Sequence, residues 1–278
     1  MSVARAMPEL PEVETVRRLL EPDLVGARVK EAWADLERIT MPSVGEFIEG
    51  MQGRRILEAR RHGKQLYFPL DDRRFMLAHL GMTGRLHVER DVEEIIGAPH
   101  VHGVLFLSRG RRLVYHDPRT FGFLGIADDT GFLSRMGPDP SLPDFDEESV
   151  VACLEGRSVR VKAALLDQRF VAGLGNIYAD EVCWQARVHP EQRLGTMSRR
   201  RLREVVSFIR PVLERALEAH GATLKSKTYE TLFGVGGDYL PDVYERTGEP
   251  CNRCGTVIRH GVLSGRSYHF CPRCQRKR

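Results

Sequence analysis

The sequence contains no long apolar run, either at its start or further along. A membrane helix needs roughly 18 consecutive apolar residues, and a secretory signal needs an apolar core of about 7–15 residues. Neither pattern occurs among the 278 residues. We therefore expect a cytoplasmic protein with no membrane partner. In that reducing compartment the six cysteines should remain thiols unless they bind a metal.

Several familiar functional patterns are also missing. The sequence shows no Ser-His-Asp arrangement, no Walker-type phosphate loop and no repeat of solenoid period. Residues 251–278 contain seven Lys or Arg but no Asp or Glu. Clustered arginines on a compact segment favour a phosphate-bearing partner, whereas the alternative is a basic tail that is only a solvated end.

The hydrophobic periodicity of the sequence changes along the chain. Short β-type runs separated by Gly or charged turns fill residues 24–127, which is typical of a β-sandwich or barrel. Segment 136–149 has three prolines and five acids, so we interpret it as an interdomain linker. After this segment the apolar residues recur at helical spacing, and Asn176 and Ser198 are expected to be N-caps. Residues 227–242 are expected to form a mobile loop. The β-type runs are ARVKEAW, QLYFPL, RFMLAHL, GVLFLS, RRLVYH and FGFLGIA, and the helical stretches are VKAALLD, NIYADEVCWQA and SRRRLREVVSFIRPVLERALEAH.

The stretch AMPELPEVETVRR (6–18) predicts a helix. Pro11 suits a first helical turn, an apolar stripe of valines and leucine follows at helical spacing, and Pro22 is expected to stop the helix. This interpretation leaves Pro8 and Glu9 without a structural role, although they directly follow Met7, a second possible start.

Four cysteines form the strongest local motif. CNRC and CPRC give two C-x2-C pairs separated by sixteen residues, a spacing that matches a tetrahedral four-cysteine zinc site. Four thiolates leave no open coordination position, so one structural Zn2+ is expected, and it should hold a hairpin that presents Arg266. The ligands are Cys251, Cys254, Cys271 and Cys274.

Other candidates have both a structural and a functional interpretation. Glycines precede the helix expected at Asn176 and would bring its backbone close to a docking phosphate. Lys162, upstream, would add a positive charge. A simple tight turn is an equal alternative. HLGMTGRL and YHDPRTFGF either form ordinary hairpins or present an apolar and cationic wedge for a DNA duplex. Lys64 is either an ordinary exposed lysine or a phosphate contact. The wedge residues are Met82, Arg119 and Phe121; Cys153 and Cys183 are expected to be buried free thiols.

The motifs MPELPEVE, HLGMTG, DPRTFG, GLGNIYADE, GEPC and the four-cysteine module occur in the order of the Fpg/Nei family of DNA repair glycosylases, which the sequence resembles over residues 7 to 274. The resemblance implies an α+β fold: an N-terminal β-sandwich flanked by helices, a helical domain with a helix–two-turn–helix motif, and a zinc finger, with DNA bound in the cleft between the domains. The expected boundaries are 7–135, a linker at 136–149, 150–240 and 241–278.

The resemblance also implies an activity. It predicts a monomeric DNA glycosylase and AP lyase that removes oxidised purines from damaged double-stranded DNA and cuts the strand by β,δ-elimination. By motif, Pro8 is the nucleophile, Glu9 the acid/base, and Lys64 serves the reacting sugar and phosphate. Asn176 and Arg266 hold phosphates. Met82, Arg119 and Phe121 fill the space left by the flipped base.

Two alternatives stay open. One is a Nei-like enzyme for oxidised pyrimidines, although PELPEV favours the purine branch; segments 227–242 and VYER (243–246) depart from the family pattern. The other is a catalytically silent binder that retains MSVARA. A proline nitrogen inside a chain is an amide nitrogen and cannot form an iminium, so we expect the working enzyme to begin at Pro8.

Overall fold

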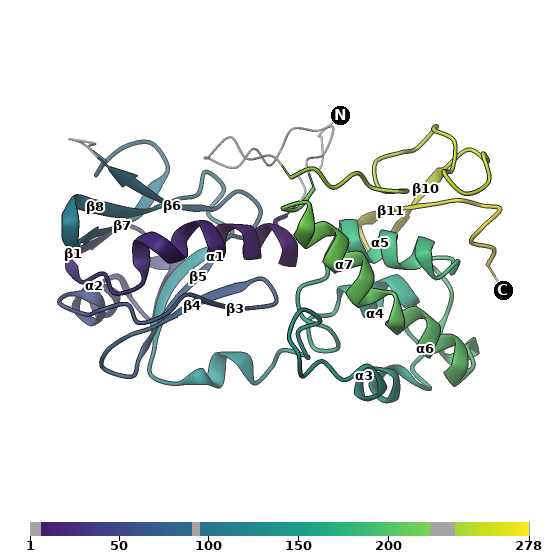
Figure 1. Cartoon of the computed structure of the whole chain (residues 1–278), viewed down its shortest axis with the longest axis horizontal. Coiled ribbons are helices and arrows are strands. Elements are labelled where there is room, and N and C mark those ends of the chain that lie inside the picture. The colour runs from purple at the N-terminus through teal and green to yellow at the C-terminus, as the bar shows by residue number, and fades with distance from the viewer. Residues whose placement is uncertain (1–6, 91–94, 223–236, 278) are drawn as a thin grey trace. The chain divides into compact units, whose positions relative to one another are not determined.

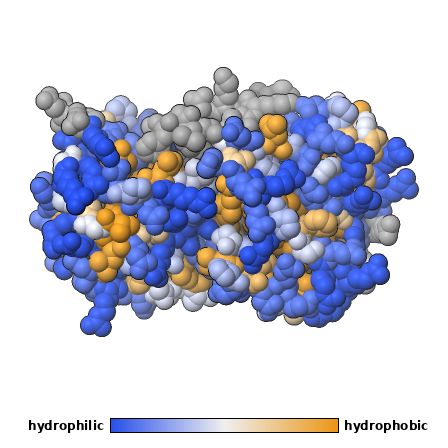
Figure 2. Space-filling model, in the orientation of Figure 1, coloured by the Kyte–Doolittle hydropathy of each residue, from blue (hydrophilic) through white to orange (hydrophobic). Residues whose placement is uncertain are grey.

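The computed structural model describes residues 7–90, 95–222 and 237–277 (Figure 1). The described residues form two compact units. The sheet unit comprises 12–90 and 95–135, and the helical unit comprises 7–11, 136–222 and 237–277. None of the described helices is both long and apolar enough to cross a membrane. On the face shown in Figure 2, hydrophilic residues predominate and apolar atoms gather only in small groups.

The sheet unit is a β-sandwich. One sheet has the strand order β1-β7-β8-β6 and the other β2-β9-β5-β4-β3, and every pairing is antiparallel except β2 with β9. Leu105 of the first sheet and Phe68 of the second share one buried core with Val16 and Leu20 of helix α1. The elements are α1 (Leu10–Leu24), β1 (Val29–Ala34), β2 (Thr40–Met41), α2 (Val44–Met51), β3 (Arg60–His62), β4 (Gln65–Pro69), β5 (Phe75–His79), β6 (Arg85–Arg90), β7 (Val101–Leu107), β8 (Arg111–His116) and β9 (Phe123–Ala127).

All six predicted β-type runs contain a strand. The prediction that Pro22 stops the first helix is wrong, because α1 continues to Leu24. A proline removes one backbone hydrogen bond to the residue four positions earlier, and this loss falls in the last turn, just before Gly26 turns the chain with φ +79°. Helix α1 begins in the helical unit, where Leu10 joins the core, and continues into the sheet unit.

The helical unit contains α3 (Glu147–Leu154), α4 (Val161–Leu166), α5 (Asn176–Gln185), α6 (Arg199–Ser207) and α7 (Ile209–Glu218). The long stretch expected over 198–220 is therefore two helices that meet at Phe208. Pro211 explains the break, because its ring clashes with the carbonyl of Ser207 in a continuous helix. Ser198 is the N-cap of α6 and accepts the Arg201 N–H, as predicted.

A small hairpin, β10 (Arg259–Leu263) and β11 (Arg266–Phe270), lies between the two cysteine pairs. Cys251 and Cys271 are buried in a cluster with Trp184 and Ile258, which attaches the hairpin to helix α5. Cys183 is a buried free thiol as expected, whereas the same expectation for Cys153 is wrong because that residue is exposed. The buried face of α3 is formed by its neighbours Val150, Val151 and Leu154.

Candidate active site and zinc centre

Glu9 occupies the N-terminus of helix α5. Its carboxylate accepts the backbone N–H of Gly175 at 2.7 Å, of Ile177 at 2.8 Å and of Tyr178 at 3.3 Å. These donors have no partner inside the helix, and the helix dipole also favours a negative charge here. Glu9 is only 2 % exposed, so three donors compensate the burial of its carboxylate.

Two glycines allow this close approach. A Cβ on Gly175 would lie 2.3 Å from Cδ of Glu9, and one on Gly173, where φ is +98°, would lie 2.7 Å from Cβ of Leu10. The Leu10 N–H also donates to the Gly173 carbonyl at 3.1 Å. The expectation that this helix start holds a phosphate through its N–H groups is therefore corrected, because Glu9 of the same chain uses those donors. Pro8, directly before Glu9, is buried.

Asn176 is the first residue of α5, so its expected role as N-cap is wrong; Gly175 holds that position without a side-chain bond. The Asn176 amide instead donates to the hydroxyls of Ser267 at 3.3 Å and Tyr244 at 3.4 Å. Its Oδ1 is buried and, within the described residues, accepts no hydrogen bond. With the amide turned over, both hydroxyls would donate to Oδ1, and the NH2 group would take the buried position.

Arg266 is exposed at the start of β11. It directly precedes Ser267, whose side chain contacts Asn176. Burial raises the pKa of Tyr244, whose phenol therefore stays neutral. Tyr244 and Ser267 were missed by sequence reasoning. The only signal was the motif VYER, which differs from the family pattern next to the tyrosine.

Lys162 is buried, with 1 % exposure. Its ammonium donates to Asp180 Oδ1 at 2.7 Å, to the Ser267 carbonyl at 2.8 Å and to the Asn176 carbonyl at 3.5 Å. An ammonium has three donors, so these contacts use all of them. The expectation of a direct contact between Lys162 and DNA is corrected, because the side chain instead joins α4, α5 and β11 beneath Asn176.

In the sheet unit, the loops that carry Met82 and Phe121 touch each other. A Cβ on Gly81 would lie 2.5 Å from the Gly122 nitrogen, and one on Gly122 would lie 2.1 Å from the His79 carbonyl oxygen. The structure thus brings the three predicted wedge residues onto two adjacent loops. The Arg119 guanidinium lies over the Phe121 ring at 4.6 Å, and Phe121 is 57 % exposed.

Asp117 fastens the two loops together. Its carboxylate is fully buried and accepts the Thr83 hydroxyl at 2.6 Å, the Gly122 N–H at 2.9 Å, and the Arg119 N–H and Tyr115 hydroxyl at 3.3 Å. Three donors from the two loops and a fourth from strand β8 therefore converge on one side chain. This role was not predicted, although DPRTFG contains the aspartate.

Lys64 follows Gly63 in the turn between β3 and β4 and is 7 % exposed, so it is not the ordinary exposed lysine of the structural alternative. The next residue, Gln65, pairs with His79 across β4 and β5. Burial, together with the positive charge of Lys64, lowers the pKa of His79 to about 4, although the negative charge of Asp117 opposes the shift. The His79 ring is thus neutral, and its Nδ1 accepts the Gly81 N–H at 3.0 Å.

The four predicted zinc ligands converge. Their sulfur atoms all lie within 4.8 Å of one another, and Cys254 Sγ is 3.5 Å from Cys271 Sγ. A tetrahedral site with Zn–S bonds of about 2.3 Å places its sulfurs roughly 3.8 Å apart, so the cluster fits one zinc ion. Among the described residues, this is the one group of three or more potential ligands close enough to hold a metal. Zinc bound there has four protein ligands and a structural role.

Comparisons with known proteins agree with this architecture. The formamidopyrimidine-DNA glycosylase N-terminal domain matches residues 7–124, its H2TH domain matches 136–228, and a zinc finger found in FPG and IleRS matches 248–276. A sandwich, a helix–two-turn–helix domain and a zinc finger define the class of zinc-finger DNA glycosylases.

Individual relatives span almost the whole chain. The formamidopyrimidine-DNA glycosylases of Herpetosiphon aurantiacus and Heliobacterium modesticaldum are 39% and 40% identical, each covering 97% of this chain and 100% of the relative. The crystal structure of MutM (FPG) from Thermus thermophilus superposes with a TM-score of 0.87 at 37% identity, covering 98% and 100% of the two chains. Lactococcus lactis Fpg in complex with DNA that contains an abasic site gives 0.87 at 34% identity, covering 97% and 100%. The chain belongs to the formamidopyrimidine-DNA glycosylase family.

Proposed function

We propose that this protein is a DNA glycosylase and AP lyase that excises oxidised purines, such as 8-oxoguanine and formamidopyrimidines, from duplex DNA and works as a monomer. Membership of the family supports the activity on damaged DNA. The observation that supports this chemistry most directly is the position of Glu9, the residue next to Pro8. Its carboxylate is held by three backbone hydrogen bonds at the start of helix α5.

Pro8 is the nucleophile in this proposal. As the free N-terminus it is a secondary amine with a pKa of about 8, and its lone pair attacks the sugar C1′ while the bond to the damaged base breaks. The base leaves with the bonding electron pair and takes up a proton. The Glu9 carboxylate takes up the amine proton and passes it to the ring oxygen as the sugar opens, which leaves an iminium between Pro8 and C1′.

The iminium then acts as the electron sink for strand cleavage. Removal of a C2′ proton sends electrons toward the iminium and expels the 3′ phosphate, and a second elimination expels the 5′ phosphate. In this proposal Glu9 moves protons at both stages, and the three backbone hydrogen bonds that hold its carboxylate in one orientation support this role. Lys64, in the sheet unit, serves the sugar and phosphate.

Phosphate binding in the helical unit falls to Asn176 and Arg266. Asn176 has hydroxyl partners that fix its amide, and Arg266 is exposed on the hairpin. Lys162 is a positioning residue in this account, since its ammonium holds the backbone carbonyls of Asn176 and Ser267. When zinc is bound to the four cysteines, it keeps that hairpin folded.

Base extrusion explains the two loops of the sheet unit. A base inside a duplex hides its glycosidic bond, so the nucleotide must leave the stack and the gap must be filled. Met82, Arg119 and Phe121 supply an apolar and cationic surface for that gap. Asp117 and the contact between Gly81 and Gly122 hold their loops together, which supports the proposal that the gap-filling surface is formed before DNA binds.

The test uses matched duplexes with one lesion each: 8-oxoguanine, an oxidised pyrimidine, or no lesion. We expect excision and a one-nucleotide gap with phosphates at both ends for 8-oxoguanine, at a rate at least about tenfold above that for the pyrimidine. Faster pyrimidine excision would assign the protein to the Nei-like alternative. Tight binding of the lesion duplex without any cleavage would show a silent binder.

A further inference from the structure

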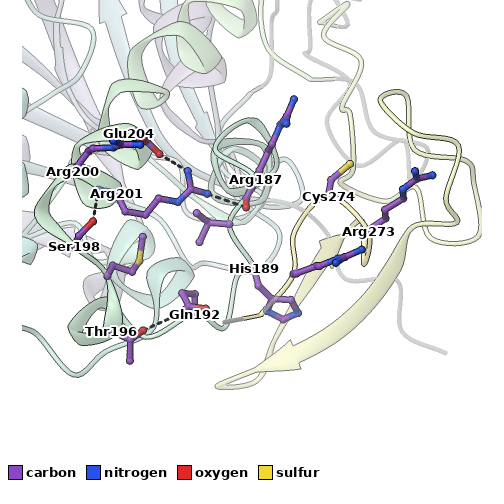
Figure 3. A pocket seen from close by; sticks show the side chains of 13 residues that line it. Arg187, His189, Gln192, Thr196, Ser198, Arg200, Arg201, Glu204, Arg273 and Cys274 are labelled. Carbon is purple, nitrogen blue, oxygen red and sulfur yellow. Dashed lines mark hydrogen bonds and ion pairs between the residues drawn. The ribbon is translucent and has the colours of Figure 1, made fainter.

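A basic hollow of about 910 Å³ lies in the helical unit, away from the residues assigned to catalysis. Figure 3 shows its two sides: Arg187, Arg200 and Arg201 come from the segments around α5 and α6, and Arg273 comes from the zinc hairpin region on the other side. Arg187 follows the C-terminal end of α5, whereas Asn176 begins that ten-residue helix. The two ends of such a helix are about 15 Å apart.

The arginines of this hollow differ in how they are used. Arg201 is part of the wall, since it pairs with Glu204 and donates to the carbonyls of Ala186 and Arg187 at 2.6 and 3.0 Å. Arg187, Arg273 and Arg276 are exposed, and none of them has a carboxylate within ion-pair distance among the described residues. Glu204, which also faces Arg200 at 3.4 Å, is the single acid among the described residues that line the hollow.

The same hollow has an apolar part. Val188 is buried and Met197 packs against the core of the helical unit, and both line the hollow. His189 lines it as well, with its ring packed against Phe270 at a centroid distance of 4.5 Å. Cationic groups above an apolar floor bind a ligand that carries both negative charge and apolar side chains.

The concave shape of the hollow distinguishes between two anionic partners, duplex DNA and an acidic peptide. Duplex DNA is stiff over about 50 nm and carries its phosphates on a convex surface, so it meets protruding cations better than the floor of a hollow. An extended peptide is narrow enough to place side chains inside. Arginine binds carboxylates in a bidentate fashion, and a leucine-sized side chain matches the contact with Val188 and Met197. We propose that this hollow docks an acidic peptide segment of a partner protein, one that combines carboxylates with apolar side chains.

The test measures fluorescence anisotropy of a labelled peptide, Asp-Glu-Leu-Asp-Glu-Leu-Asp-Glu, with the zinc-loaded full chain. A second peptide has serine at both leucine positions. The double variant Arg187→Ala/Arg200→Ala removes two arginines that line the hollow and is named the groove variant. The matched control, Arg38→Ala/Arg169→Ala, removes the same charge at two exposed positions outside the hollow. Met197→Ser tests the floor. Affinity for an undamaged duplex is measured for every variant.

We expect the groove variant to weaken binding of the leucine peptide about tenfold, a few-fold for each exposed charge, and the control to change it less than about twofold. Met197→Ser should weaken the leucine peptide and leave the serine peptide unchanged. Duplex affinity should be the same for the groove variant and its control. The proposal is overturned if the wild type shows no saturable peptide binding, if groove and control variants bind the peptide equally, or if the groove variant loses duplex affinity at least as strongly as peptide affinity.

Discussion

Glu9 and Gly175 are joined by a hydrogen bond of 2.7 Å between a carboxylate oxygen and a backbone N–H, although 166 positions separate them in the chain. The bond ties the residue after the proposed nucleophile to the first turn of helix α5, whose first residue, Asn176, is a proposed phosphate ligand. The proposed acid/base Glu9 and the proposed phosphate ligand Asn176 are thus fixed to one helix, so we expect a change at this bond to affect the chemistry before it affects the zinc hairpin.

Gly175→Ala should displace Glu9, because the new Cβ would lie 2.3 Å from Glu9 Cδ. We expect the free energy of unfolding to fall by about 1–3 kcal/mol, as for overpacking, and Schiff-base formation to slow by roughly 100-fold, since small misplacements of reacting groups are costly. Urea unfolding and single-turnover trapping measure the two effects. The control is Gly45→Ala, because a Cβ there has no atom within 4 Å. Equal activity of the two variants would refute the proposed role of the hydrogen bonds between Glu9 and helix α5.

Asp117→Ala should release the two wedge loops from each other. The buried Gly122 N–H and the partly buried Thr83 hydroxyl lose their acceptor, and a buried group left unpaired costs about 1–3 kcal/mol. We expect excision of 8-oxoguanine to slow far more than binding to undamaged duplex, because the wedge acts only after extrusion. The exposed Asp128→Ala should behave as wild type. A uniform loss of both activities would contradict a specific role in holding the wedge.

His79 should make the sheet unit less stable in acid. Its pKa is about 4 in the folded protein against 6.5 for the free side chain, chiefly because of burial, so the unfolded chain binds more protons between these values. The free energy of unfolding should therefore fall as pH decreases from 6.5 to 4, by up to about 1.4 kcal/mol per pH unit from this group. His79→Asn keeps an acceptor for the Gly81 N–H and does not titrate. Urea unfolding should show a shallower pH dependence for this variant, and an identical dependence would contradict the assignment.

Removal of zinc should unfold the hairpin and leave the sheet unit folded. Binding energy at a four-cysteine site is folding energy, whereas the sandwich has a separate core of its own. We expect one zinc per chain in the wild type, and Cys254→Ser or a strong chelator should abolish binding to duplex DNA. Elemental analysis, DNA binding and the thermal transition of the sandwich are compared. Full activity in zinc-free protein would contradict this prediction.

The local parts of the fold were predictable from sequence. Strand β4 shows the reason, because alternation and turn residues next to Lys64 are signals carried by the segment itself. The helix break at Phe208 was also encoded, by Pro211, but the apolar period on both sides concealed it. Ser198 was identified correctly as a cap because its own side chain makes the bond.

Contacts between distant segments were not predictable in the same way. The start of α5 is capped by Glu9, a side chain from the other end of the chain, so local rules placed the cap one residue late, at Asn176. The burial of Lys162 depends on Asp180 and on a carbonyl of β11. Neither partner follows from the lysine's own surroundings, and the family motif carries no information on its exposure.

The central claim is that the Pro8 nitrogen attacks the sugar, and borohydride trapping on a duplex with an abasic site tests it most directly. One form of the protein begins at Pro8, after removal of the initiating Met7; the other carries Met7→Leu and keeps residues 1–6 attached. An amide nitrogen has its lone pair delocalised into the carbonyl, whereas a terminal secondary amine with a pKa of about 8 forms the iminium that borohydride reduces. The account predicts a covalent adduct only with the first form, located at Pro8 by mass spectrometry, while both forms still bind duplex. Equal trapping of the extended form, with its N-terminus shown to be intact, would contradict the assignment of Pro8 as the nucleophile.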